Sequence, residues 1–199
     1  PTVHVAFSPR AALLAGAALI PAAVRVLDAA ARDLGANPAL RARLVAELCD
    51  AGGACGMVGG QQLDLEGEAG AVVDGAGLEQ IHRAKTGALL AASLRIGALA
   101  AGAGDEALHG LTIYGRELGL AFQIVDDVLD VTQADAVLGK TAGKDANTGK
   151  ATYPSLFGLE RAREMARKRV DRAVGALDRA GIASAELRAL AAYVLERDR

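Results

Sequence analysis

The sequence has few aromatic residues, few cysteines and no excess of charge of either sign. Its 199 residues include no Trp, three Phe, three Tyr and two Cys, and the formal net charge is −2. So low an aromatic content does not fit a pocket that steers cations with aromatic faces. The near-neutral charge gives no reason to expect nucleic acid or an anionic membrane as a partner. An anionic ligand would therefore have to be bound by local lysines.

The two cysteines, Cys49 and Cys55, lie in a segment with helical periodicity. Their spacing is not that of a zinc site, and we expect reduced thiols in the core of a cytoplasmic protein. The longest apolar stretch runs from Ala11 to Val24 and contains Pro21. We expect this stretch to be too short and too interrupted to form an integral membrane segment.

Long helices are predicted for most of the chain. Apolar residues recur at three- and four-residue spacing, Ala and Leu dominate, and alternating runs of β-branched residues are missing. The hydrophobic content of 52% supports one domain covering 1–199. We expect an all-α antiparallel helical bundle with helices over 9–33, 38–66, 75–103, 105–131, 155–180 and 184–197.

Three aspartates, Asp126, Asp127 and Asp130, end an apolar stretch of the helix predicted over 105–131. On a helix they fall within an arc of about 100°, so we expect them to face one way. Repulsion and lost hydration would destabilise such a cluster unless it binds cations. Carboxylate oxygens suit Mg²⁺, which commonly joins one or two protein carboxylates to substrate phosphates. A solvated acidic helix end is the alternative interpretation.

The segment 132–152 is the main stretch predicted to be non-helical. It contains Lys140, Lys144 and Lys150, each directly after a glycine. A glycine lets the backbone approach an anion while the neighbouring ammonium reaches over it. Lysines of polar loops are often merely solvated, but the nearby aspartates favour a diphosphate clamp made of carboxylates, metal and lysines.

Two further segments place polar side chains on apolar helices. Gln61 and Asp64 share one helix face among small residues, which indicates either a binding site or close packing against a neighbouring helix. Lys85 and Thr86 lie near the start of an apolar helix. Because a cation there opposes the helix dipole, we expect Lys85 to have an additional partner.

Five motifs, in this order, resemble those of the trans-isoprenyl diphosphate synthases, the family of farnesyl and geranylgeranyl diphosphate synthases. They are GGQQLDL (59–65), HRAKTGAL (82–89), GLAFQIVDDVLD (119–130), LGK (138–140) and GKATYP (149–154). The resemblance implies an isoprenoid-synthase bundle around a central cavity. It also implies Mg²⁺-dependent, head-to-tail transfer of a prenyl group from an allylic diphosphate to isopentenyl diphosphate. Family members are typically homodimers.

The resemblance assigns a role to each matching polar residue. The metal ligands would be Asp126, Asp127 and Asp130. The departing diphosphate would be held by Lys85, Lys140 and Lys150, while Thr86 and Gln123 would lie along the reacting carbons. Lys85, Thr86, Gln123 and Lys140 would thus be the catalytic residues. Phe122, Gln61 and Asp64 would complete the substrate site.

The first aspartate-rich motif of the family, and the arginine pair after it, normally precede a segment like residues 1–7. Neither is present here, so the chain resembles the C-terminal two-thirds of a synthase, and we expect it to be inactive or nearly so by itself. A non-catalytic subunit of a heteromeric prenyl synthase would tolerate this loss but has little need of the lysines. A terpene cyclase would need more aromatic residues, and a purely structural bundle leaves the aspartates unexplained.

Overall fold

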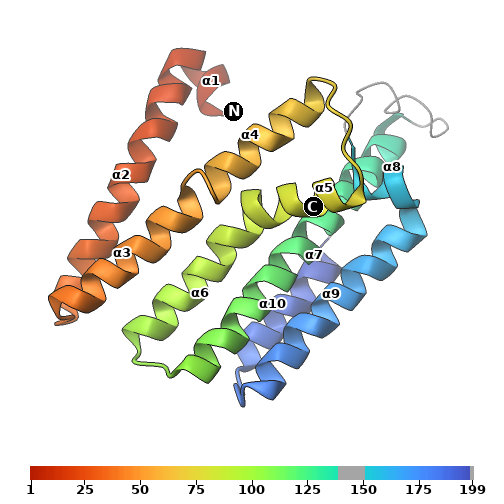
Figure 1. The fold of residues 1–199 in the computed structure, drawn as a ribbon. Coiled ribbons are helices and arrows are strands. Elements are labelled where there is room, and N and C mark those ends of the chain that lie inside the picture. Colours follow the sequence, from red (N-terminus) through yellow and green to blue (C-terminus); the bar gives the residue numbers. More distant parts are fainter. Residues whose placement is uncertain (139–150, 198–199) are drawn as a thin grey trace.

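The computed structural model describes residues 1–138 and 151–197, and these parts of the chain contain helices and no strand (Figure 1). The predicted all-α class is therefore confirmed. The helices are α1 (Val3–Ala6), α2 (Pro9–Asp33), α3 (Pro38–Gly52), α4 (Met57–Glu68), α5 (Gly75–His82), the π-helix η1 (Arg83–Gly87), α6 (Ala88–Ala100), α7 (Asp105–Leu138), α8 (Tyr153–Phe157), α9 (Leu159–Arg179) and α10 (Ala185–Glu196).

The long helices pack side by side in the order α2, α3, α6, α7 and α9, and α10 packs against both α7 and α9 (Figure 1). Helix α4 continues the line of α3 toward the end of the bundle where α5, η1 and α8 lie. That end also receives the part of α7 that carries the three aspartates. The motifs over 59–65, 82–89 and 119–130 therefore lie at this end of the bundle, whereas those over 138–140 and 149–154 fall partly outside the described residues.

Helix α7 is the centre of the main core. One side of it contributes Tyr114, Leu118 and Ala121, which are almost completely buried against α9 and α10. Helix α9 presents buried alanines such as Ala162 and Ala166. Because alanine side chains are short, the axes of α7 and α9 can approach closely, and the apolar area they bury is the main force that holds this end of the bundle together.

Helix α2 begins and ends where it was predicted, but the expected interruption at Pro21 is wrong. The side chain of Ser8 accepts the N–H of Ala11 and caps the helix, which runs unbroken through Pro21 for 25 residues. Its length and apolarity would suffice to cross a membrane, and none of its apolar window is buried in the structure. Length and composition alone do not separate a membrane helix from a core helix of a soluble protein.

The helix predicted over 38–66 is two helices. α3 ends at Gly52 and α4 begins at Met57, because Gly53 takes an extended conformation and Gly56 also leaves the helical region. Cys49 and Cys55 are free and exposed at this junction, so the prediction that they belong to the core is wrong.

Three other boundaries differ from the prediction. The helix predicted over 75–103 contains the π-helical turn η1, and the one predicted over 105–131 continues to Leu138. The backbone of 132–138 is therefore helical rather than loop. The helix predicted over 155–180 is divided into α8 and α9 by Gly158, whose φ of +82° is a conformation that side chains disfavour.

Candidate functional site

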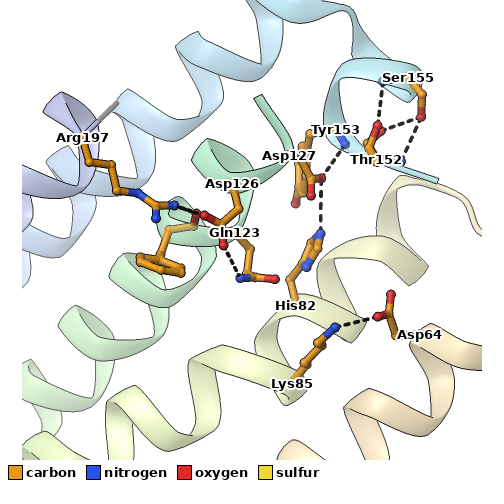
Figure 2. A network of polar contacts seen from close by, with 11 residues as sticks. Asp64, His82, Lys85, Gln123, Asp126, Asp127, Thr152, Tyr153, Ser155 and Arg197 are labelled. Carbon is orange, nitrogen blue, oxygen red and sulfur yellow. Dashed lines mark hydrogen bonds and ion pairs between the residues drawn. The ribbon is translucent and has the colours of Figure 1, made fainter. Parts of the chain in front are cut away.

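The candidate site lies where α4, η1 and α7 meet. Figure 2 shows two bonded groups at this junction: Lys85 of η1 with Asp64 of α4, and Gln123 with Asp126, both of α7. Helix η1 contacts both α4 and α7. Thr86 follows Lys85 in η1 and is half-buried, as is Gln61 on α4. The structure thus brings together most of the site residues predicted from the sequence, although they come from three separate helices.

Lys85 has the additional partner that the sequence predicted. Its ammonium nitrogen lies 2.7 Å from a carboxylate oxygen of Asp64, which is almost completely buried. The close approach of α4 and η1 depends on Gly60, because a Cβ atom built there would lie 2.3 Å from the backbone nitrogen of Lys85. An ammonium has three donors, so Lys85 can keep Asp64 and still bind an anion from the exposed side.

The π-helix η1 changes the register of the helix that carries Lys85. A π-helical turn inserts one residue and re-aims the side chains around it, and such turns are frequent at functional sites. Gly87 of η1 meets Gly119 of α7, where a Cβ atom would lie 2.7 Å from the Cα of Gly87. This glycine contact brings the backbone that carries Lys85 and Thr86 next to the helix that carries Gln123.

Asp126 projects from α7 with 38% of its side chain exposed. One of its oxygens pairs with the guanidinium of Arg197, just after α10, and the other accepts a hydrogen bond of 3.3 Å from Gln123. Arg197 also donates to the carbonyl of Phe122 at 2.8 Å and lies 3.8 Å above the ring of that residue. The sequence contained no signal for Arg197, because it lies far from every motif.

Asp127 points to a different set of partners. One carboxylate oxygen accepts the backbone N–H of Tyr153 at 2.9 Å and lies 3.6 Å from Nε2 of His82 (Figure 2). Its side chain is only 12% exposed. The expectation that all three aspartates face one way is therefore wrong, because Asp127 faces His82 and the start of α8, whereas Asp126 faces Arg197 and Gln123.

The prediction that Asp126, Asp127 and Asp130 bind a metal ion can be compared with where their side chains lie. Within residues 1–132 and 151–197, no three His, Cys, Asp or Glu side chains lie close enough together to bind one metal ion. Asp126 and Asp130 are one helical turn apart, and Asp130 is exposed. Two such carboxylates fit a Mg²⁺ ion that takes most of its other ligands from water and a bound diphosphate. Lys140, Lys144 and Lys150 lie outside the described residues.

An ion-pair network holds η1 against α7 and α9. Arg83 bonds to Glu79 at 2.8 Å and to Glu117 at 3.1 Å, and Arg169 of α9 bonds to the same two glutamates at 2.8 and 3.1 Å. These four half-buried groups satisfy one another, so the end of η1 next to Lys85 is fixed to two other helices. Sequence reasoning missed this network because its members lie far apart in the chain.

Two buried tyrosines, Tyr114 of α7 and Tyr153 of α8, differ in whether their hydroxyl groups form a hydrogen bond. Burial raises the pKa of both Tyr114 and Tyr153 to about 12. Tyr114 donates to the carbonyl of Leu187 at 2.7 Å, whereas the hydroxyl of Tyr153 has no hydrogen-bond partner within the described part of the chain. Both hydroxyl groups are thus held in the neutral form, but only that of Tyr114 contributes a bond.

This difference predicts opposite outcomes for the same substitution. Tyr114→Phe is expected to lower the free energy of unfolding by about 1 kcal/mol, because the carbonyl of Leu187 loses its partner. Tyr153→Phe keeps the ring and removes an unpaired hydroxyl, so it is expected to leave stability unchanged or to raise it slightly. Urea unfolding followed by circular dichroism measures both, and an equal loss in the two variants would contradict this account.

Comparison with known proteins identifies the family of this chain. A family model described as polyprenyl synthetase matches residues 1–190. The chain is 45% identical to the farnesyl diphosphate synthase of Escherichia coli (strain K12), over 100% of this chain and 67% of that protein.

Among solved structures, the fold is similar to an FPP/GFPP synthase of Zymomonas mobilis, with a TM-score of 0.78, 36% identity, and 98% of this chain and 64% of the other covered. It is also similar to a geranyltransferase of Helicobacter pylori complexed with magnesium and isoprenyl diphosphate, with a TM-score of 0.79, 32% identity, and 98% and 63% covered.

The chain spans about two thirds of the length of these relatives. Nearly all of this chain matches that one family, both in sequence and in fold. The chain belongs to the polyprenyl synthetase family.

Proposed function

We propose that this chain serves head-to-tail prenyl transfer, in which an allylic diphosphate condenses with isopentenyl diphosphate. The observation that carries the proposal is the meeting of Lys85 with the helix of Asp126 at one junction of a polyprenyl synthetase fold. An ammonium and a carboxylate pair from different helices suit a diphosphate and its metal ion, respectively. Membership of the polyprenyl synthetase family supports this reaction class.

The first task of the site is to stabilise the departing diphosphate. The carbon–oxygen bond breaks with its electron pair, which places additional negative charge on the diphosphate oxygens. Lys85 would donate to these oxygens, and its pairing with Asp64 holds the ammonium in place before substrate arrives. A fixed positive group stabilises the developing charge more than it stabilises the ground state, so it lowers the barrier.

Asp126 and Asp130 are the residues that would hold Mg²⁺, which, when bound, neutralises diphosphate charge. The choice of Mg²⁺ is supported by hard oxygen ligands and by the magnesium-bound relative from Helicobacter pylori. Arg197 now occupies one oxygen of Asp126, so we infer that this guanidinium moves when the metal binds. Lys140 and Lys150 are proposed to complete the diphosphate contacts.

The second task is to guide the carbocation to the double bond of isopentenyl diphosphate. Thr86 and Gln123 are proposed to lie along the reacting carbons, with Phe122 and Gln61 completing the proposed substrate site. The neighbouring helices are rich in Ala, Leu and Gly, which offer few nucleophiles to compete for the cation. After attack, loss of a proton from the new carbocation completes a lengthened allylic diphosphate.

We also propose an oligomeric state and a cellular location for the protein. The exposed apolar side chains of α2, which include Leu13, Leu14 and Ile20, are compatible with a surface that packs on a second copy in a homodimer. We place the reaction in the cytoplasm, in keeping with two free and exposed thiols.

One assay tests the proposed function. Residues 1–199 alone, and the protein with any upstream sequence that its gene encodes, are incubated with Mg²⁺, labelled isopentenyl diphosphate and dimethylallyl, geranyl or farnesyl diphosphate. A chain-lengthened labelled diphosphate from the longer protein, and little or none from 1–199, is the expected result. Product that forms only after a second subunit is added would favour a partner subunit instead, and a cyclic hydrocarbon product would favour a cyclase.

A further inference from the structure

Within the proposed function, we propose that Asp127 is a positioning residue that fixes the start of α8 to α7, and that it is not a ligand of the metal ion. The inference rests on the proposed function only in taking Asp126 and Asp130 as metal ligands. Asp126 and Asp130 remain the metal ligands, so the three aspartates of the motif divide between two tasks.

The contacts of Asp127 are those of a structural anchor. Its carboxylate accepts the backbone N–H of Tyr153 at 2.9 Å and faces Nε2 of His82 at 3.6 Å. The side chain is 12% exposed, against 38% for Asp126. A metal ion that bridges to a diphosphate needs carboxylate oxygens open to solvent, and Asp127 instead uses its Oδ2 atom for contacts with Tyr153 and His82.

The N–H that Asp127 accepts is one that the helix itself leaves unsatisfied. Tyr153 is the first residue of α8, and Thr152 caps this helix by accepting the N–H of Ser155 at 3.2 Å. The hydroxyl of Ser155 in turn accepts the N–H of Thr152 at 2.9 Å. This reciprocal cap does not reach the N–H of Tyr153, and a buried N–H needs a partner, which Asp127 supplies.

His82 joins the same junction from the other side. Its imidazole is about 5% exposed and stacks on the ring of Tyr153, with a centroid distance of 5.7 Å and an interplanar angle of 23°. Neither ring nitrogen has a hydrogen-bond partner within the described residues, and Asp127 is the carboxylate that faces it. His82 is also the residue directly before η1.

The anchor therefore connects the three elements that carry the proposed site. η1 presents Lys85 and Thr86, α7 presents Asp126 and Asp130, and α8 follows the segment that contains Lys150. A single carboxylate at their meeting point holds the spacing between the proposed metal ligands and the proposed diphosphate ligands. Its removal should disturb that spacing without removing a metal ligand.

The test uses the full protein and compares Asp127→Asn, Asp127→Ala and Asp126→Asn. Mn²⁺ with inorganic pyrophosphate is the probe, and electron paramagnetic resonance measures bound Mn²⁺. We expect Asp127→Asn to bind as much Mn²⁺ as the unsubstituted protein with an unchanged midpoint, and Asp126→Asn to bind less Mn²⁺. In EDTA, Asp127→Ala is expected to lower Tm by about 4 °C or more, and Asp127→Asn to recover most of that loss, because its amide oxygen can still accept the N–H.

Loss of Mn²⁺ binding in Asp127→Asn would overturn the proposal, and so would a Tm of Asp127→Ala in EDTA equal to that of the unsubstituted protein. If Asp127→Ala fails to fold while Asp127→Asn folds, the anchor is supported. Failure of the proposed function has a separate sign, which is the absence of Mn²⁺ and pyrophosphate binding in the unsubstituted protein. The thermal comparison in EDTA still tests the anchor in that case.

Discussion

Substitution of Asp126 by alanine is expected to lower kcat by at least about 10³-fold in the full protein while leaving its helix content unchanged. The carboxylate is 38% exposed and its bonded partners are the polar groups of Arg197 and Gln123, so its loss changes charge rather than packing. Without it, Asp130 alone would remain to hold a metal ion at this position of α7. Product formation from labelled isopentenyl diphosphate and far-ultraviolet circular dichroism measure the two quantities.

Asp171 provides a matched control. It is an exposed aspartate on α9, on a helix that contributes no proposed ligand. Asp171→Ala removes the same charge and is expected to leave kcat within about twofold of the unsubstituted value, because screened surface charges act weakly at a distance. Turnover of Asp126→Ala within about tenfold of the unsubstituted protein would contradict its proposed role as a metal ligand.

Substitution of Gly60 by alanine is expected to lower stability strongly, because the added methyl group meets the backbone of a neighbouring helix. The new Cβ atom would lie 2.3 Å from the backbone nitrogen of Lys85 and 2.8 Å from its Cα. Backbone cannot move aside as a flexible side chain can, so α4 and η1 must separate. We expect the free energy of unfolding to fall by about 1–3 kcal/mol. Turnover should also fall, since Lys85 would leave Asp64.

Gly97 is the matched control for Gly60. It lies within α6, is exposed, and has nothing within 4 Å of the position of a new Cβ atom. Gly97→Ala is expected to raise stability by about 0.5–1 kcal/mol, because alanine loses less backbone freedom on folding. Urea unfolding measures both variants. Equal effects of the two substitutions would show that the α4 to η1 contact is not as close as described.

Local periodicity explains why the fold class and the positions of most helices were predictable. Helix α2 has a cap at Ser8 and a regular apolar pattern, and both signals lie within a few residues of each other. The break between α3 and α4 was harder to predict, because glycine lowers helix stability without forbidding it. Whether Gly53 stays helical depends on what packs around it.

The candidate site was predictable in its members and only partly in its arrangement. The motifs around Lys85 and Asp126 were recognised by residue type and spacing. The spacing suggested that Asp127 faces the same way as its neighbours. The structure turns it toward Tyr153, a residue 26 positions later in the chain, and the partner of Asp126 is Arg197 from beyond α10.

The sequence alone predicted the all-α class and placed the aspartate-rich and lysine-bearing segments on helices, because residue type and helical period act over a few neighbouring positions. The order of its motifs also showed the resemblance to the trans-isoprenyl diphosphate synthases. The tertiary structure decided that Asp126 is more exposed than Asp127. It also decided that Lys85 pairs with Asp64 and that Asp126 pairs with Arg197. These choices depend on groups such as Asp64, His82 and Arg197, which approach only when distant helices pack. Burial and hydrogen bonding between such helices cannot be derived from the local pattern.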